Sequence, residues 1–298
     1  MINFIFSIPK WIKPHLYLEK DFKDLTKDEI ADLRLRLDKF NTSDPEISIM
    51  IPAWNEENNI YRTLSSLAST TTKLKAELVV INNNSTDNTQ QVLDVLGVKS
   101  LQQPIQGTPH ARQMGLINAK GAYHLCADSD SFYPPGWIDQ MIKPMQANSD
   151  LVGVYGRYSF LPTDGKNRFA LSVYEHITGI LVRMRRFKRE HINVLGFNMG
   201  FKTDVGKKNG GFEVTEVRKF DNAKGSEYFV EEAEDGRMAL NLKKSGNLKL
   251  ITNADARVFT SSRRLMAEGG IMQSFLSRLL LHTKRMQEYI SGPSAKNL

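Results

Sequence analysis

Short apolar runs and amphipathic stretches alternate along the chain from residue 46 onward. In the first run, at residues 47–51, isoleucine takes every second position until Pro52 ends the run, which is typical of a strand. The runs at residues 78–81 and 122–127 are mostly apolar throughout, as in strands that are buried on both faces. These runs predict three strands of one sheet.

The stretches between the runs repeat their apolar residues at helical spacing. Residues 60–67 place an isoleucine and two leucines on one face, and residues 86–96 begin with a Thr-Asp pair that suits a helix cap. Pro109 suits the first turn of another helix, in which we expect Met114 and Ile117 to face inward. A helix after each strand predicts an α/β fold, with a mostly parallel central sheet flanked by helices on both faces.

The pattern is looser after residue 150. It predicts a strand over 151–160, a helix with a basic end over 167–189, a glycine-rich loop with a short helix over 196–211, a helix over 231–244, a strand over 248–251 and a basic helical tail from residue 261.

Composition narrows the class of protein. The 298 residues carry a formal net charge of +7, which suits polyanions such as nucleic acid, anionic lipid or phosphorylated substrates. The one cysteine, Cys126, excludes an intrachain disulfide, so nothing favours an oxidising compartment. No apolar run is long enough to span a bilayer, and residues 1–11 lack the leading basic residues of a signal peptide. We therefore expect a cytoplasmic protein.

Asp128 and Asp130 stand at the end of the third predicted strand. Positions i and i+2 of an extended segment point the same way, so both carboxylates can reach one region beyond the strand end. Ligands of open α/β sheets bind at this edge, and Mg²⁺ and Mn²⁺ favour carboxylate and phosphate oxygens. The pair indicates a metal site for a nucleotide diphosphate, although two solvated loop acids are the simpler explanation if the pair is taken alone.

Other motifs surround this pair in a fixed order. They are Pro52–Glu56 after the first strand, Asn82–Asp87 after the second, Arg112 on the helix before the third, segment 196–201 with segment 210–212, and the pair Glu234-Asp235. Together with Asp128-Ser129-Asp130 they resemble the family-two glycosyltransferases, over roughly residues 46–245.

The resemblance implies the GT-A fold and a division of the chain. An N-terminal extension at residues 1–44 would precede a catalytic domain at 45–250, and a basic helical tail would follow at 251–298. The catalytic domain would contain a nucleotide-binding half at 45–150 and an acceptor half at 151–250.

The resemblance also implies a donor site. Its residues would be Pro52, Ala53, Asn55, Glu56, Asn82, Asn84, Arg112, Asp128 and Ser129. Mn²⁺ or Mg²⁺ would bind Asp130, with Asp128 as its second contact. Arg112 would pair with the diphosphate or with the two aspartates, because its planar fork matches both groups, and a surface arginine is the alternative.

By the same resemblance Asp235, beside Glu234, is the general base that deprotonates the acceptor hydroxyl. Glu231 lies one helical turn away and is the fallback base. Asn198 and Phe212 would contact the donor sugar or the acceptor, and packing explains Phe212 equally well.

Three departures from the family pattern affect these expectations. Asn82 replaces the usual aspartate, which leaves the choice between uracil and guanine open. Segment 258–264 lacks a histidine for the metal, so its ligands would be aspartate, phosphate and water. Arg263 and Arg264 could instead hold the diphosphate, with a solvated basic face as the alternative. Residues 273–278 lack the Q-x-x-R-W motif, which indicates a non-processive enzyme.

The sequence therefore favours an inverting, metal-dependent transferase that moves a sugar from a nucleotide-diphosphate sugar, preferably a UDP-sugar, to a glycan or lipid-linked acceptor in cell-surface polysaccharide synthesis. The alternatives are a sugar-nucleotide pyrophosphorylase and a non-enzymatic basic protein that binds nucleic acid or membrane. We expect no nucleic-acid partner, because aromatic residues are not interleaved with the basic runs. Peripheral contact at the inner face of the cell membrane, suggested by the basic run at residues 183–189, and the oligomeric state are left open.

Overall fold

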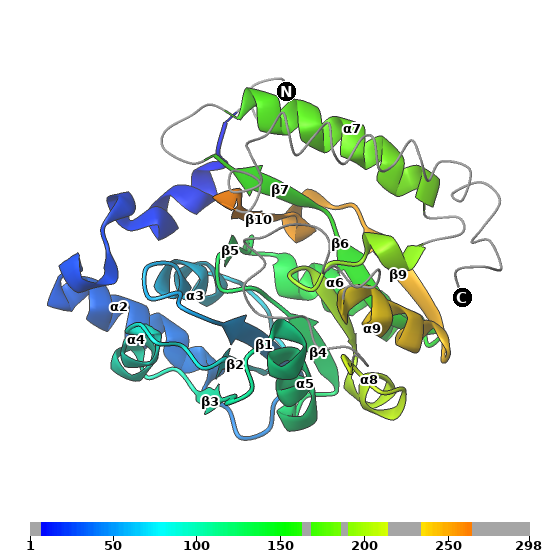
Figure 1. Cartoon of the computed structure of the whole chain (residues 1–298), viewed down its shortest axis with the longest axis horizontal. Coiled ribbons are helices and arrows are strands. Elements are labelled where there is room, and N and C mark those ends of the chain that lie inside the picture. The colour runs from blue at the N-terminus through cyan, green and yellow to red at the C-terminus, as the bar shows by residue number, and fades with distance from the viewer. Residues whose placement is uncertain (1–6, 163–167, 186–189, 214–233, 264–298) are drawn as a thin grey trace.

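The computed structural model describes residues 7–162, 168–185, 190–213 and 234–263. A seven-stranded sheet lies at the centre of the molecule, with helices packed around it (Figure 1). Neighbouring strands are parallel, except that β8 runs antiparallel to β4 and β6. The predicted, mostly parallel sheet is therefore confirmed. In spatial order the strands are β3 (Ser100–Gln102), β2 (Ala76–Asn82), β1 (Ile47–Ala53), β4 (Tyr123–Cys126), β8 (Met199–Lys202), β6 (Leu151–Gly156) and β9 (Asn247–Ile251).

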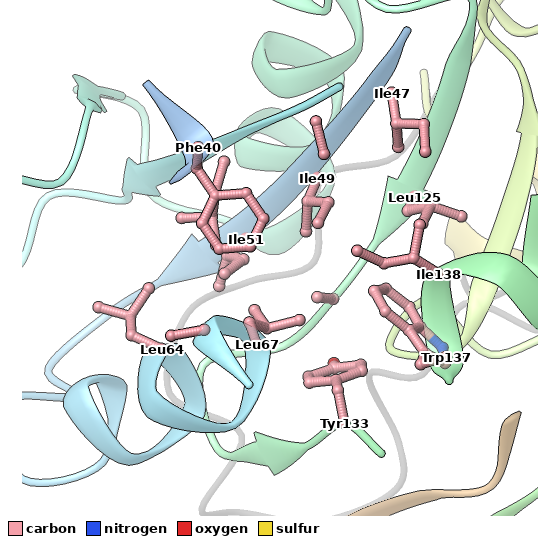
Figure 2. Packing of buried hydrophobic residues seen from close by; sticks show 14 of the residues in the cluster. Phe40, Ile47, Ile49, Ile51, Leu64, Leu67, Leu125, Tyr133, Trp137 and Ile138 are labelled. Carbon is pink, nitrogen blue, oxygen red and sulfur yellow. The ribbon is translucent and has the colours of Figure 1, made fainter. Parts of the chain in front are cut away.

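Helices cover both faces of this sheet, as predicted. Ile47, Ile49 and Ile51 of β1 point into one core together with leucines of the neighbouring helix (Figure 2). Met50, between them, points into a cluster on the opposite face with Ala111. The first core is covered by α2 (Lys27–Leu37), α3 (Ile60–Ala68), α4 (Thr89–Leu96) and α6 (Trp137–Ala147), and the opposite face by α5 (Thr108–Asn118), α8 (Thr203–Lys208) and α9 (Glu234–Lys243).

A second sheet contains strands that the sequence did not resolve. The single strand predicted over 151–160 is wrong, because the chain breaks at Arg157 into β6 and β7. A Cβ added at Gly156 would lie 2.3 Å from Nδ2 of Asn198, so only glycine fits where this amide crosses the end of β6. The three strands of the second sheet are β5 (Ser131–Phe132), β10 (Val258–Ser261) and β7 (Tyr158–Leu161).

β8 occupies a segment that the sequence predicted to be loop. It pairs with β4 on one side and with β6 on the other. Gly200 permits this approach, because an added Cβ would lie 2.5 Å from Cδ2 of Leu125 on β4. Four residues that include a glycine are too few to show a strand period, which explains why the pattern missed β8.

The inward face of α5 also differs from the prediction. Ile117 was expected to face the core but is 62 % exposed, whereas Met114 is partly buried as expected. The buried face is formed by Ala111, Gly115 and Leu116. An added Cβ at Gly115 would lie only 3.2 Å from Cβ of Met50, so small residues set the close packing of α5 on β1.

The N-terminal extension shares the main core. The Thr26–Glu29 capping box begins α2, and Leu33 and Leu37 of this helix join Phe40 in the core that covers β1. The limits of the three predicted regions stay a prediction. Short 3₁₀ segments complete the described structure: η1 (Lys10–Glu19), η2 (Phe22–Asp24), η3 (Asp38–Phe40), η4 (Glu190–Asn193) and η7 (Ala254–Ala256).

Helix α7 (Phe169–Arg185) lies along the outside of the molecule, beside β7 (Figure 1). It agrees with the helix predicted over 167–189 within the described range. No helix in the described part of the chain has both the length and the apolar character that a membrane crossing requires. Most of the basic tail predicted from residue 261 lies outside the described residues.

Candidate active site

The loops that follow β1 and β2 are joined by hydrogen bonds at the carboxyl edge of the sheet. Asn55, which has a left-handed φ of 53°, accepts a hydrogen bond from the backbone N of Thr86 (2.8 Å) and donates its own backbone N–H to Oγ of Ser85 (3.1 Å). The backbone N of Glu56 donates to Oγ1 of Thr89 (2.8 Å). The two predicted donor-binding turns therefore form one unit.

The buried side chain of Asn82 stabilises the turn that follows β2. Its side-chain Nδ2 donates to Oε1 of Gln90 (2.9 Å), and its Oδ1 accepts from the backbone N of Ser85 (3.0 Å). With 2 % exposure, Asn82 is positioned to hold the loop, whereas Asn84 is exposed. Ala53 is buried in the main core, and Pro52 is half-buried beside it.

The loop that carries Asp128 and Asp130 is held from two sides. Oγ1 of Thr63 on α3 donates to the carbonyl of Ser129 (2.9 Å) and accepts from the backbone N of Ser131 (3.1 Å), so it brackets Asp130. On the other side, the backbone N of Asp128 donates to the buried hydroxyl of Tyr133 (2.9 Å). Both contacts orient the loop.

The sequence interpretation missed both of these positioning residues. Thr63 had a detectable signal, because it falls on the same helical face as Ile60, Leu64 and Leu67, and a buried hydroxyl needs a partner. Tyr133 had no comparable signal.

Arg112 connects the aspartate pair to the predicted catalytic pair. It is buried (5 % exposed), so it is not the surface arginine considered as an alternative. Its Nη2 lies 2.8 Å from Oδ1 of Asp128, and its Nη1 donates to the carbonyl of Gly196 (2.9 Å). Its Nε lies 3.6 Å from Oδ1 of Asp235 and 4.0 Å from Oε1 of Glu234. One guanidinium thus contacts three carboxylates from two distant parts of the chain.

The electrostatics of this cluster favour a proton acceptor. Burial raises the pKa of Asp235 to about 7, with the carboxylate of Glu234 acting in the same direction and Arg112 opposing it. Burial opposes the charge of Arg112, but Asp128 and Asp235 raise its pKa above the usual value. Among the described residues, the buried Oδ1 of Asp235 has no hydrogen-bond partner, which leaves it an acceptor position.

Gly196 leaves space for this cluster. A Cβ added there would lie 2.2 Å from Oδ1 of Asp235 and 2.4 Å from Cζ of Arg112. Gly196 also acts on both neighbours through its backbone, since its carbonyl accepts from Arg112 and its N–H lowers the pKa of Asp235. Sequence reasoning placed residue 196 in an acceptor-side segment but did not identify this role.

Asp130 and Glu56 both form ion pairs with the guanidinium of Arg263. Nη2 of Arg263 lies 3.1 Å from Oδ2 of Asp130 and 2.8 Å from Oε1 of Glu56. Burial raises the pKa of Glu56, and Arg263 opposes this shift. No three Asp, Glu, His or Cys side chains gather as a metal cluster within the described residues. One or two carboxylates are nevertheless sufficient for Mg²⁺ when substrate phosphates and water complete its shell, so Asp130 and Glu56 fit a cation held together with a diphosphate.

The predicted sugar or acceptor contacts lie in the core. Oδ1 of Asn198 accepts from Nε1 of Trp137 (2.9 Å), and Nδ2 donates to two backbone carbonyls. Phe212 is fully buried and lies under the guanidinium of Arg112, 5.9 Å from the ring centre. This geometry supports packing roles for both residues, and it gives no support to a sugar contact. Glu231 and Arg264 lie outside the described residues.

Comparison with known families identifies this constellation. The profile described as Glycosyl transferase family 2 matches residues 48–208, which is more than half of the chain. The chain belongs to glycosyl transferase family 2. The match favours a glycosyltransferase over the pyrophosphorylase and the non-enzymatic binder that were considered as alternatives.

Curated relatives of this family-2 chain include two glycosyltransferases. GlyA of Streptococcus pneumoniae is 28 % identical over 142 residues, which are 45 % of this chain and 20 % of GlyA. AglE of Haloferax volcanii is 27 % identical over 180 residues, which are 56 % of each chain. The chain thus spans between a fifth and about half of the length of these relatives.

A solved mannosyltransferase structure has a similar fold. The mannosyltransferase PcManGT from Pyrobaculum calidifontis, in complex with GDP-mannose and Mn²⁺, superposes with a TM-score of 0.55 at 18 % sequence identity. The superposition covers 84 % of this chain and 70 % of that one. The predicted GT-A architecture is therefore confirmed.

Proposed function

We propose that this family-2 chain is an inverting, metal-dependent glycosyltransferase that uses a nucleotide-diphosphate sugar and glycosylates a hydroxyl of a glycan or a lipid-linked acceptor. In one displacement, the acceptor oxygen bonds to the anomeric carbon, the bond from that carbon to the diphosphate oxygen breaks, and the hydroxyl proton moves to Asp235. A role in building cell-surface polysaccharide is part of this proposal.

The unused oxygen of Asp235 is the observation that carries the proposal. Oδ1 is buried and forms no hydrogen bond to any described residue, and its ion pair with Nε of Arg112 is long (3.6 Å), so it can accept a proton without first breaking a hydrogen bond. A pKa of about 7 suits a base that works near neutral pH. Arg112 lies between this oxygen and Asp128, which keeps the base close to the donor side of the site.

The donor and the cation belong at the other end of the cluster. PcManGT is in complex with GDP-mannose and Mn²⁺, which supports the same class of donor and a divalent cation here. Asp130 would hold the cation, which when bound neutralises the departing diphosphate. We propose Glu56 as its second contact in place of the predicted Asp128, because Oδ1 of Asp128 is paired with Arg112. We favour a UDP-sugar. Both polar ends of the Asn82 amide are used within its turn, so selection of the base would fall to neighbouring groups such as Asn84.

A thermal-shift panel tests the donor site. UDP, GDP, CDP, TDP and their common sugars are each measured with and without Mn²⁺, because a ligand that binds the folded state raises Tm. We expect metal-dependent stabilisation by one diphosphate, abolished in Asp130→Ala and retained in Asp204→Ala. Asp204 is an exposed aspartate on α8 and serves as the charge-matched control.

A transfer assay with the stabilising donor then tests the reaction. The product should have the anomeric configuration opposite to that of the donor, because a single displacement inverts this carbon. Retention of configuration, or the absence of a Tm shift with every nucleotide, would contradict the proposal.

We also propose that the chain contacts a membrane peripherally through α7. Phe169 and Val173 lie one helical turn apart and are 59 % and 44 % exposed, and five of the seven residues at 183–189 are basic. Co-sedimentation with anionic vesicles, but not with neutral ones, is the expected result. Equal recovery in the supernatant with both vesicle types would contradict it.

A further inference from the structure

Arg263 is held at the aspartate pair by the second sheet. β10 ends at Ser261, whose backbone N donates to the carbonyl of Asp130 (3.2 Å). Ser261 Oγ in turn accepts from the backbone N of Arg263 (3.2 Å). These contacts place the guanidinium beside Asp130, although the two residues are far apart in the sequence.

One nitrogen of this guanidinium serves two carboxylates. Nη2 lies 2.8 and 3.1 Å from the two oxygens of Glu56 and 3.1 Å from Oδ2 of Asp130. Two anionic groups that converge in this way repel each other unless a positive charge lies between them. The guanidinium therefore supplies the charge that a bound cation would supply at the same oxygens.

The contact of Arg263 with the two carboxylates can be replaced by a contact with a metal ion. The side chain of Arg263 is 48 % exposed, so water can solvate the guanidinium once it leaves. Ion pairs with this much exposure are weaker than buried ones, so a divalent ion with a diphosphate can replace them. Arg112, by contrast, is buried and pairs with Asp128.

We infer that Arg263 is a built-in competitor for the divalent cation and sets the affinity of the Asp130–Glu56 site for metal. The inference rests on the proposed function, because it takes that site as the metal site. A cation that binds Oδ2 of Asp130 must take the place of Nη2 of Arg263. Metal alone therefore binds weakly, and linkage requires that the metal also weakens the contact of Arg263 with the carboxylates.

Direct titration of the full chain with Mn²⁺ tests this inference without a donor or a turnover assay. Calorimetry compares the wild type with Arg263→Gln and Arg263→Lys. Lys143→Gln on α6 removes an equally positive, exposed side chain away from the site and controls for net charge. Asp130→Asn identifies the binding that belongs to the site, and the Tm of every variant confirms that it is folded.

We expect Arg263→Gln to bind Mn²⁺ at least about five-fold more tightly than the wild type, a typical size for coupling between two sites. Arg263→Lys should lie between them, and Lys143→Gln should match the wild type. Unchanged or weaker Mn²⁺ binding by Arg263→Gln, or the absence of binding to every variant, would overturn the inference.

Failure of the proposed function has a different signature. If Arg263→Gln gains Mn²⁺ affinity that Asp130→Asn abolishes, the competition is established even when no nucleotide diphosphate binds. If a diphosphate binds with Mn²⁺ while Arg263→Gln shows no gain, the donor site stands and the competitor role fails.

Discussion

The half of the chain that we propose binds the donor (residues 45–150, the donor half) and the half that we propose binds the acceptor (residues 151–250, the acceptor half) are organised differently. In the donor half, β1, β2 and β4 are parallel, so the loops at 54–59, 83–88 and 127–130 meet at one edge as a direct result of chain direction. In the acceptor half, β8 runs the other way, so the segment that precedes it, rather than the one that follows it, reaches the same edge. Gly196 thereby meets Arg112.

The two halves also differ in the contacts that hold their site residues in place. The donor loops are tied to one another mainly by polar contacts between neighbouring turns, such as those of Asn55 with Ser85 and Thr86. The acceptor side depends on long-range burial, because Arg112 and Asp235 come from opposite halves of the chain and share a site that water barely reaches. Changes on the acceptor side should therefore affect the reaction itself, and changes on the donor side should affect metal or nucleotide binding.

The largest effect should come from Asp235→Asn. The amide cannot accept the proton of the acceptor hydroxyl, so kcat should fall by about 100- to 10,000-fold while donor binding persists. Single-turnover kinetics and donor titration measure the two quantities separately. Asp204→Asn, at an exposed site, should leave both unchanged. Full transfer activity of Asp235→Asn at saturating donor would remove Asp235 as the base.

Gly196→Ala should have the next largest effect. The added methyl group would have to displace Asp235 and Arg112, whose atoms lie 2.2 and 2.4 Å from its position, and a misplaced catalytic group can cost about 100-fold in rate. Gly179→Ala on α7 is the matched control, because nothing lies within 4 Å of that Cβ. Comparable kcat values for the two variants would show that Gly196 does not position the base.

Thr63→Val should act on the donor side instead. It keeps the shape of the side chain but leaves the carbonyl of Ser129 and the N–H of Ser131 without a partner, which should cost about 1–3 kcal/mol of stability. Loss of this support for Asp130 should weaken Mn²⁺ binding by about tenfold, as for other residues that orient metal ligands. Thr63→Ser retains the hydroxyl and should restore Mn²⁺ binding. Equal Mn²⁺ affinity in both variants would show that the two hydrogen bonds of Thr63 are not needed to position Asp130.

The smallest expected effect is on stability against pH. Because the pKa of Asp235 is raised to about 7, the folded state holds its proton more tightly than the unfolded state does. The contribution of Asp235 to stability should therefore be fully present below about pH 4 and be lost as the pH rises to about 7. Urea unfolding at pH 5 and pH 8 measures this change. The wild type should lose at least about 1 kcal/mol relative to Asp235→Asn over this interval, and parallel curves would contradict the raised pKa.

The sequence by itself determined the fold class and the edge of the sheet at which the polar turns meet. Alternating isoleucines in β1 and continuous apolar runs in β2 and β4 define strands through local periodicity, and the polar turns after them follow from chain direction. The family resemblance added the order of the motifs, from Pro52 to Asp235. These features are local or sequential, which is why they can be seen without coordinates.

Tertiary structure alone decided how these motifs act on one another. β8 is too short for a visible period and exists because β4 and β6 pair with it, and the strand at 151–160 divides because Asn198 crosses it. The burial of Arg112 between Asp128 and Asp235, and the position of Arg263 on Asp130, depend on contacts between residues that are distant in sequence. Burial and charge pairing depend on distances in space, and no spacing along the chain encodes those distances directly.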